Sequence, residues 1–275
     1  MREGVALVVM LAGCGRVGFG AEPLEVPPDA PRDPSVPSGC IGADEDRDGW
    51  PNACDTCPTV PNADQADRGE TEVGGAADGV GDACDPRPAV SGDRVAVAMF
   101  HDGADPYELY NATSYTAAGA LRLGTNASEG SASFTMPLTA TRVEIAYTIV
   151  SSSNVLQWFG VWIHRAQPDA IFLEAAWSQQ IGSGVWRIKE QNGGEDFYSA
   201  DIVGPSRFSS GQRFRLVGDT ALATGGPFVL RVTDLDRGVT DEVSSTITLA
   251  PAANGYLEAY RATIDFDYLV IYAAP

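Results

Sequence analysis

From residue 93 onward the chain consists of short stretches in which apolar and polar residues alternate, separated by Gly, Pro, Asn, Asp and Ser. Alternation with a period of two predicts β-strands, and the separating residues favour turns. The strands expected on this basis are 94–100, 120–123, 131–136, 142–150, 156–164, 171–177, 184–189, 197–202, 213–217, 228–234, 244–249 and 262–272. No stretch of this region has the period of a helix. Such regularly spaced strands are typical of an antiparallel β-sandwich or barrel, so the chain is predicted to be mostly β.

The strand expected over 156–164 divides its large side chains between two faces. The two sets are Trp158, Trp162 and His164 on one face and Phe159, Val161 and Ile163 on the other. Aromatic rings on an exposed face could stack on sugar rings, which would make the first set a ligand-binding site. The alternative is that both faces are buried, because a sandwich interior readily accommodates tryptophan. The same alternative applies to Trp177 and Trp186.

The end of the chain carries a resemblance to a known fold. Residues 93–275 close on the sequence Asp265-Phe266-Asp267-Tyr268-Leu269-Val270-Ile271-Tyr272, in which alternation turns the carboxylates outward. With its length and number of strands, this region resembles the jelly-roll sandwiches of the concanavalin A-like and laminin G-like type. The resemblance implies a lectin-like domain that binds carbohydrate or another surface component.

The N-terminus has the pattern of an export signal. An apolar run from Val5 to Leu11 follows Arg2 and leads into Ala-Gly-Cys at 12–14. This resembles the lipobox of bacterial lipoproteins, which implies a signal peptide over 1–13 and a lipid on Cys14. Gly15 stands where an aspartate would retain such a protein at the inner membrane, so we expect an outer-membrane or cell-surface location. Which side of the outer membrane the protein faces stays open, and the bland alternative is a first β-strand.

The region over 14–39 contains a proline-rich stretch, from Ala21 to Ser38, that has almost no large apolar residues. Proline fixes φ and removes a backbone donor, so we expect a semi-rigid extended tether. No apolar run in the chain reaches the ~20 residues that a membrane-spanning helix needs.

Charge is concentrated in the segment that follows. Between residues 40 and 88 there are 12 acidic residues against three arginines, a balance of −9 within a total of −19. Solubility or halophilic adaptation would spread the charge along the chain, so its concentration favours cation binding. Lys189 is the only lysine, and such a scarcity of cations excludes a nucleic-acid-binding protein.

The run Asp44-Glu45-Asp46-Arg47-Asp48-Gly49 places carboxylates at alternate positions before a glycine. Alternate residues of a tight loop can point at one cation, and carboxylate oxygens suit Ca²⁺ better than zinc or copper. The site would continue with the carbonyl of Trp50 and the side chains of Asn52 and Asp55.

Three further motifs extend this loop: Asp-Thr-Cys-Pro at 55–58, Pro-Asn-Ala-Asp-Gln-Ala-Asp at 61–67 and Asp-Gly-Val-Gly-Asp-Ala-Cys-Asp at 78–85. Together they resemble thrombospondin type 3 repeats, which implies a calcium-binding segment over 40–88. The implied ligands are Asp44, Asp46, Asp48, Trp50, Asn52 and Asp55 for a first ion, and Asn62, Asp64, Asp67, Asp78, Val80, Asp82 and Asp85 for a second. The stretch 68–77, with Glu70 and Glu72, replaces a shorter acidic motif and lengthens the second loop.

Four cysteines remain once Cys14 is lipidated, and four cysteines allow three pairings. The resemblance implies Cys57–Cys84, with Cys40–Cys54 as the other pair. We expect metal and disulfides to stabilise this segment as a stiff spacer, because it has few apolar residues that could form a core of its own. A zinc site at Cys54-x-x-Cys57 and a disordered acidic linker are the alternatives.

Signals for catalysis are weak. The chain has two histidines and lacks the H-E-x-x-H and G-x-S-x-G motifs. It also lacks the E-x-D-x-E strand of jelly-roll glycosidases, and Glu174, Glu190, Glu195 and Asp196 have the pattern of isolated or loop carboxylates. We therefore expect a non-enzymatic, calcium-binding surface lipoprotein that binds carbohydrate or extracellular matrix in adhesion. A polysaccharide-degrading hydrolase or lyase and a purely structural envelope protein are the alternatives.

Overall fold

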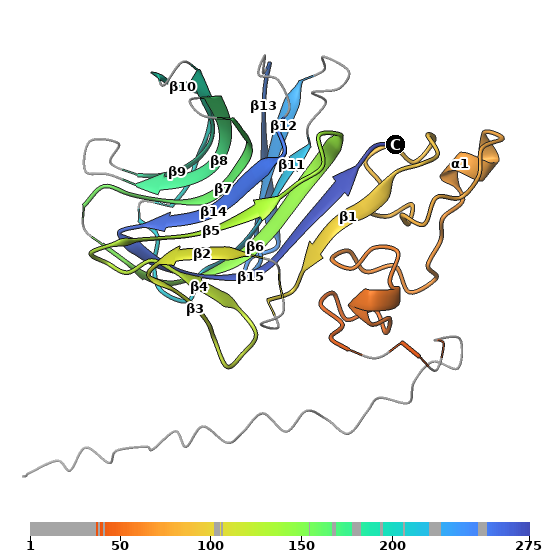
Figure 1. The fold of residues 1–275 in the computed structure, drawn as a ribbon, viewed down its shortest axis with the longest axis horizontal. Coiled ribbons are helices and arrows are strands. Elements are labelled where there is room, and N and C mark those ends of the chain that lie inside the picture. The colour runs from red at the N-terminus through yellow and green to blue at the C-terminus, as the bar shows by residue number, and fades with distance from the viewer. Residues whose placement is uncertain are drawn as a thin grey trace, which may run out of the picture.

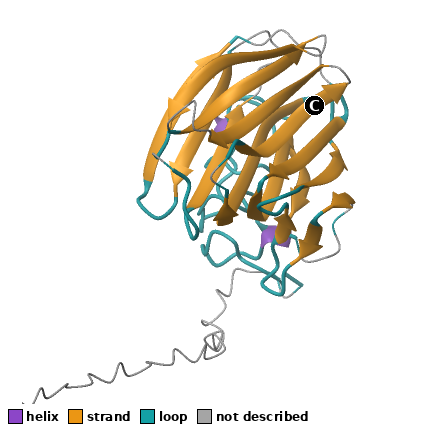
Figure 2. Ribbon diagram, turned by 90° about the vertical axis from the view of Figure 1, so that its left-hand side faces the viewer, coloured by secondary structure: helices purple, strands orange, loops and turns teal. Residues whose placement is uncertain are grey.

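The computed structural model describes residues 37, 39–40, 42–101, 105, 107–153, 155–166, 169–177, 183–192, 195–205, 207–219, 227–246 and 252–275, with only the backbone of 164–166, 169–170, 177, 192 and 196–199. The expected signal peptide, Cys14 and nearly all of the expected tether lie outside these residues. Within them two antiparallel sheets form a sandwich (Figure 1), which confirms the predicted fold class. Figure 2 shows that helix is confined to two short turns. No helix in the described part of the chain is long and apolar enough to cross a membrane.

The eight-stranded sheet, here sheet A, contains in order β13 (Val239–Ser245), β12 (Phe228–Asp234), β11 (Arg213–Asp219), β6 (Ala140–Ser152), β15 (Ala262–Ala273), β4 (Leu121–Leu123) and β3 (Thr113–Tyr115), and β1 (Arg94–Met99) also pairs with β15. The seven-stranded sheet B contains β10 (Glu195–Val203), β9 (Gly184–Asn192), β8 (Asp169–Trp177), β7 (Gln157–Ala166), β14 (Asn254–Tyr260), β5 (Glu129–Thr135) and β2 (Glu108–Asn111). In Figure 1 the strands β7 to β10 bend, and the face of sheet B turned away from sheet A lies inside the bend.

The alternation of apolar residues determines which side chains meet between the sheets. On β7, Phe159, Val161 and Ile163 are fully buried in the core. From sheet A, Tyr147 packs against Phe159, with ring centroids 5.3 Å apart. Its hydroxyl accepts a hydrogen bond from the indole of Trp186 at 2.9 Å, so the one polar atom of this buried ring has a partner.

Three of the described strands were not predicted, and one begins earlier than predicted. The strands β2, β3 and β14 have no counterpart among the predicted strands, and β13 spans Val239–Ser245, whereas 247–249 of the predicted strand 244–249 lie outside the described residues. Strand β13 is an edge strand with mostly exposed residues, so it carries little apolar alternation. Strand β14 begins at Asn254-Gly255, which has the pattern of a turn. Gly255 is needed there, because a Cβ would lie 2.3 Å from the ring of Phe134.

The acidic segment over 40–93 is irregular, with a 3₁₀ turn η1 (Asn52–Cys54) and one helical turn α1 (Gly69–Glu72). Its two disulfides are Cys40–Cys54 and Cys57–Cys84, the pairing that the resemblance implied. The segment packs on the outer face of sheet A. One buried cluster joins Cys57, Val80 and Cys84 of the segment to Ala146, Tyr268, Val270 and Tyr272 of the sheet.

This contact explains why the last strand is apolar on both faces. Tyr268, Val270 and Tyr272 point away from the core and are at most 5% exposed, because the segment covers them. The carboxylates that were predicted to face outward do lie on this face. Asp265 pairs with Arg122 at 2.6 Å, and burial raises the pKa of Asp267 to about 6. The segment is therefore part of the folded body and does not act as a separate spacer.

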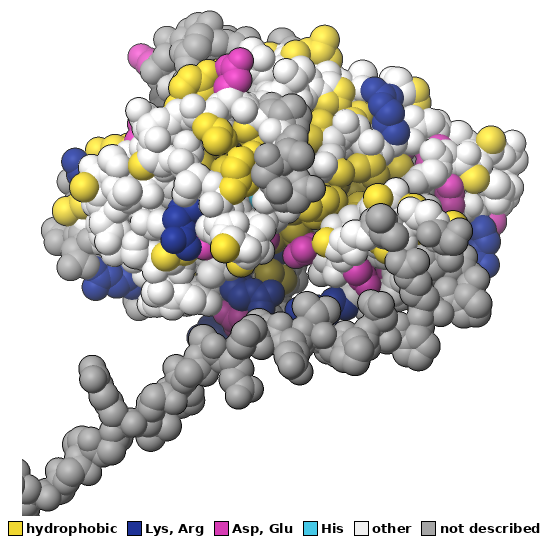
Figure 3. Space-filling view, turned by 60° about the horizontal axis from the view of Figure 1, so that its bottom comes forward, with side chains coloured by type: hydrophobic (Ala, Val, Ile, Leu, Met, Phe, Trp, Pro, Cys, Tyr) yellow, Lys and Arg dark blue, Asp and Glu magenta, His cyan; other side chains and the backbone are white. Residues whose placement is uncertain are grey.

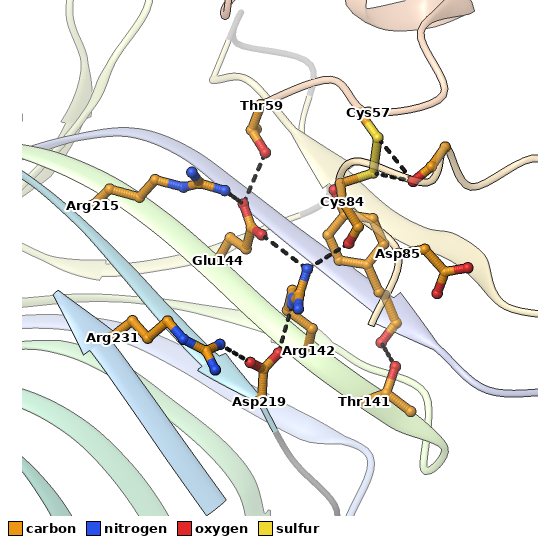
Figure 4. A network of polar contacts seen from close by, with 12 residues as sticks. Cys57, Thr59, Cys84, Asp85, Thr141, Arg142, Glu144, Arg215, Asp219 and Arg231 are labelled. Atoms are coloured by element: carbon orange, nitrogen blue, oxygen red, sulfur yellow. Dashed lines mark hydrogen bonds and ion pairs between the residues drawn. A yellow bond between two sulfur atoms is a disulfide. The ribbon is translucent and has the colours of Figure 1, made fainter. Parts of the chain in front are cut away.

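A polar network reinforces the junction (Figure 4). Glu144 of β6 is fully buried and accepts hydrogen bonds from Thr59 of the segment at 2.8 Å and from Arg215 of β11 at 2.6 Å. Arg142 donates a hydrogen bond to the carbonyl of Cys84 and pairs with Asp219 at 2.6 Å. Figure 3 shows the molecule from the side of this junction, with hydrophobic side chains in a hollow whose edge carries acidic residues.

Candidate functional site

The outer face of sheet B carries three rows of side chains, because the strand register aligns every second residue across β14, β7, β8 and β9. The first row is Tyr256, Trp162, Phe172 and Lys189; the second is Glu258, Gly160, Glu174 and Arg187; the third is Tyr260, Trp158, Ala176 and Val185. Aromatic rings thus border a central row of charged residues. This combination of apolar surface with a few convergent polar groups is typical of small-ligand sites.

The aromatic rings of this face are ordered by contact with one another. Trp158 stacks on Tyr260 with ring centroids 4.0 Å apart and planes 17° apart. Trp162 stacks on Phe172 at 4.3 Å and 4°. The Lys189 ammonium lies 5.2 Å from the centre of the Trp162 ring, within the range of a cation–π contact.

The central row holds two carboxylates with different partners. Glu258 accepts a hydrogen bond from the indole of Trp158 at 2.8 Å and from the indole of Trp162 at 2.5 Å. Glu174 pairs with Arg187 at 3.3 Å. Gly160 lies between the two carboxylates in the row and presents no side chain. A Cβ at Gly160 would lie 2.0 Å from a backbone oxygen of β8, so the close approach of the strands requires glycine here.

Accessibility differs across the face. Trp162 is only 7% exposed, whereas Trp158, Tyr256 and Tyr260 are half-buried. Towards β2 the face opens further, and Tyr110 is 45% exposed. We call these four residues, Tyr110, Tyr256, Tyr260 and Trp158, the aromatic strip. Beside the strip, the Tyr110 hydroxyl donates to Glu108 at 2.7 Å, so one carboxylate lies next to Tyr110 and another, Glu258, lies between Tyr256 and Tyr260.

The sequence identified part of this face. The predicted alternation on β7 is confirmed, since Trp158 and Trp162 point away from the core. Trp162, however, is too buried to offer an open platform, and Trp186 belongs to the core. The side chains of His164 and Trp177 lie outside the described residues. Sequence reasoning missed Tyr110, Tyr256, Tyr260 and Glu258. The alternating run Tyr-Leu-Glu-Ala-Tyr at 256–260 was the signal that could have found the last three.

The first acidic loop has the arrangement expected of a cation site. Asp44, Asp46 and Asp48 each offer an oxygen within 4.8 Å of the others. The loop turns through Gly49, whose φ of 102° is unfavourable for other residues. One carboxylate oxygen of Asp46 is buried without a hydrogen-bond donor. Burial is the largest cause that raises the pKa of Asp46 to about 7, and the neighbouring carboxylates add to it.

The other residues expected around the first ion support the loop. Asn52 accepts a hydrogen bond from the backbone N–H of Glu45 at 2.9 Å. Asp55 accepts one from the backbone N–H of Cys57 at 2.8 Å. Trp50 donates its indole N–H to the carbonyl of Ala63 at 3.3 Å.

Four of the residues expected around the second ion are divided between two carboxylate clusters, which share Glu70. Asp67 and Asp82 lie with Glu70 in one cluster, and Asp78 and Asp85 lie with Glu70 in another. Two expected ligands have other contacts: Asn62 donates to the Thr56 hydroxyl at 2.9 Å, and Asp64 pairs with Arg68 at 3.7 Å. Val80 packs its side chain into the buried cluster at the junction. Sequence reasoning missed Glu70 as a member of both groups.

The donor chemistry fits calcium. Each cluster offers only carboxylate oxygens, the ligands that Ca²⁺ prefers. The cysteines of the segment are joined in disulfides, so they offer no thiolate for zinc. When bound, calcium would neutralise the clustered carboxylates and fix the loops that carry them.

The raised pKa values lead to an expected dependence on pH. Burial raises the pKa of both Asp46 and Asp85 to about 7. A carboxyl whose pKa is higher in the folded than in the unfolded state binds its proton more tightly when folded, so the free energy of unfolding rises as pH falls through about 7. Cation-free protein should therefore melt at a higher temperature at pH 5.5 than at pH 8. Calcium-loaded protein should show the opposite trend, because protons compete with the ion. Melting curves at both pH values test this; a cation-free protein that is less stable at pH 5.5 would contradict it.

The comparisons with known proteins concern the fold. No sequence-family description and no curated protein matches the chain. Among solved structures, the CBM2 module of the evolved Dit protein of Lactobacillus casei BL23 phage J-1 is similar with a TM-score of 0.53 and 10% identity, covering 66% of this chain and 96% of that one. Lectin II from Ulex europaeus is similar with a TM-score of 0.50 and 9% identity, covering 66% of this chain and 99% of that one. The sandwich therefore has the lectin-like jelly-roll fold that the sequence predicted.

Proposed function

We propose that this protein is an exported, lipid-anchored surface protein that binds carbohydrate on the outer face of sheet B and calcium in its acidic segment. The aromatic strip carries the proposal. Its rings can stack on the apolar face of a sugar, while the exposed carboxylate of Glu108 can accept hydrogen bonds from sugar hydroxyls. The solved structures with the same fold are named as a carbohydrate-binding module and a lectin, which supports this class of ligand.

The location rests on the N-terminal signal and on the disulfides. Disulfides persist in oxidising compartments outside the cytoplasm, and the lipobox-like sequence would place the lipid on Cys14. A cell-surface protein with this face would act in adhesion to polysaccharide or extracellular matrix.

A glycan array tests the carbohydrate part. The full chain carrying Cys14→Ser, which removes the site of lipidation, should bind a restricted group of glycans. Binding should persist after chelation, because the acidic segment packs on sheet A and the aromatic strip lies on sheet B. Absence of binding to every glycan, or binding that disappears with calcium, would contradict the proposed site.

A polysaccharide hydrolase is the second candidate, favoured by the presence of Glu174 and Glu258 in one row. We propose binding without catalysis, because Glu174 is paired with Arg187 and Glu258 is held by two indole N–H groups. These contacts occupy carboxylate oxygens that a general acid or a nucleophile would need for the reaction. Release of reducing ends from a bound polysaccharide, lost in Glu258→Gln, would establish the hydrolase instead.

A further inference from the structure

Glu70 lies in the stretch 68–77 that lengthens the second acidic loop. The helical turn α1 packs closely against the chain that leads into the sandwich. The contact is so close that a Cβ on Gly69 would lie 1.9 Å from the carbonyl oxygen of Pro88. On the other side of the turn, the backbone N–H of Gly75 donates to the carbonyl of Glu70 at 2.7 Å. The added residues thus form a compact turn that holds the Glu70 side chain inside the segment.

The Glu70 side chain has no exposed surface, and neither of its carboxylate oxygens has a hydrogen-bond donor among the described residues. In each of two neighbouring carboxylates, Asp67 and Asp85, one buried oxygen likewise lacks a hydrogen-bond donor. Asp67 accepts a backbone N–H from Gly79 at 2.8 Å with one oxygen, while the other is buried without a donor. Asp85 likewise accepts from Arg87 with one oxygen only.

Four buried carboxylate oxygens without donors are costly unless a proton or a cation compensates their charge. The nearby arginines make their close ion pairs with other carboxylates, Arg68 with Asp64 and Arg87 with Asp93. Within each group the oxygens lie within 4.8 Å of one another. That separation suits oxygens around one Ca²⁺, whose ligands lie at about 2.3–2.6 Å.

We infer that Glu70 bridges two divalent cations, one held with Asp67 and Asp82 and the other with Asp78 and Asp85. The inference rests on the proposed calcium binding and specifies its stoichiometry. Once ionised, as metal ligands must be, the five carboxylates carry a charge of −5, so one divalent ion would leave −3 in a partly buried site, whereas two ions leave −1. With the loop over Asp44, the chain would hold three ions.

Equilibrium dialysis with Ca²⁺ at a concentration that saturates the wild-type chain tests this number. Wild type should bind three ions, and Glu70→Gln should bind one, because both bridged ions lose their shared ligand. Asp82→Asn and Asp85→Asn should each bind two. Glu72→Gln is the matched control, since Glu72 is an exposed residue of the same turn, and it should still bind three.

The outcomes separate the inference from the proposed function. Wild type that binds no calcium would overturn calcium binding altogether, whereas Glu70→Gln that keeps two or three ions would overturn only the bridge. Should Glu70→Gln fail to form the Cys57–Cys84 disulfide, crystals of the wild-type protein in calcium decide the question. Anomalous peaks on both sides of the Glu70 carboxylate support the bridge, and a single peak or none contradicts it.

Discussion

Replacement of Trp158 with alanine should raise the Kd for the bound glycan roughly 30-fold, the effect of losing about 2 kcal/mol at a central aromatic contact. Trp158 provides one of the half-buried rings of the aromatic strip, and its indole also holds Glu258 in place. The substitution therefore removes stacking surface and releases one donor from the carboxylate. Titration calorimetry with the best glycan from the array measures the change.

Two variants give this experiment its controls. Trp158→Phe keeps a ring but loses the N–H, so it should retain more affinity than the alanine variant. Leu138→Ala removes a side chain that is 55% exposed in the turn between β5 and β6, and it should leave the Kd unchanged. Equal losses in Leu138→Ala and Trp158→Ala would show that binding does not depend on the aromatic strip.

Glu144→Gln should lower the free energy of unfolding by about 2–3 kcal/mol. This loss is somewhat smaller than the cost of breaking a fully buried ion pair. Glu144 is fully buried, and the substitution removes the negative charge that pairs with Arg215. The Arg215 side chain, which is 23% exposed, then lacks its carboxylate partner. For a protein of this size, that loss corresponds to a melting temperature lower by roughly 5–10 °C. Scanning calorimetry of the full chain in calcium measures it.

Thr59→Val is the matched variant, because it removes the hydrogen bond that the segment donates to Glu144 and keeps the Glu144 charge. Its cost should be about 1 kcal/mol. If the segment and the sandwich fold as one unit, both variants should shift a single transition. Two separate transitions, with Thr59→Val affecting only the smaller one, would contradict the junction described here.

The sequence predicted the sandwich because its core strands alternate strongly. Strand β7 illustrates this, since Phe159, Val161 and Ile163 all reach the core as expected. Strand β14 was missed because Gly255 weakens the strand pattern, although a close approach to Phe134 requires glycine there. Half of the aromatic strip was missed with it. A ligand face depends on register between strands that lie far apart in sequence, and one chain does not reveal that register.

The acidic segment was predicted from local spacing, and local spacing also limited the prediction. The loop over Asp44 and Asp48 is a contiguous motif, so its carboxylates lie together as expected. Glu70 falls outside the repeat pattern, and only the folded turn brings it to both clusters. Docking on sheet A could not be read from the segment alone. Its trace in the sequence was the run from Tyr268 to Tyr272, which is apolar on both faces of the strand.

Hydroxyl-radical footprinting with and without bound glycan tests the central claim most directly, because it reports the solvent accessibility of individual side chains. Bound glycan should protect Trp158, Tyr256 and Tyr260 from oxidation and should leave the oxidation of Trp50 in the acidic segment unchanged. A different cavity lies at the ends of β10 and β13 and is lined by Val203 and Arg237 among others. Protection there, with the aromatic strip oxidised as in the free protein, would contradict the proposed carbohydrate site.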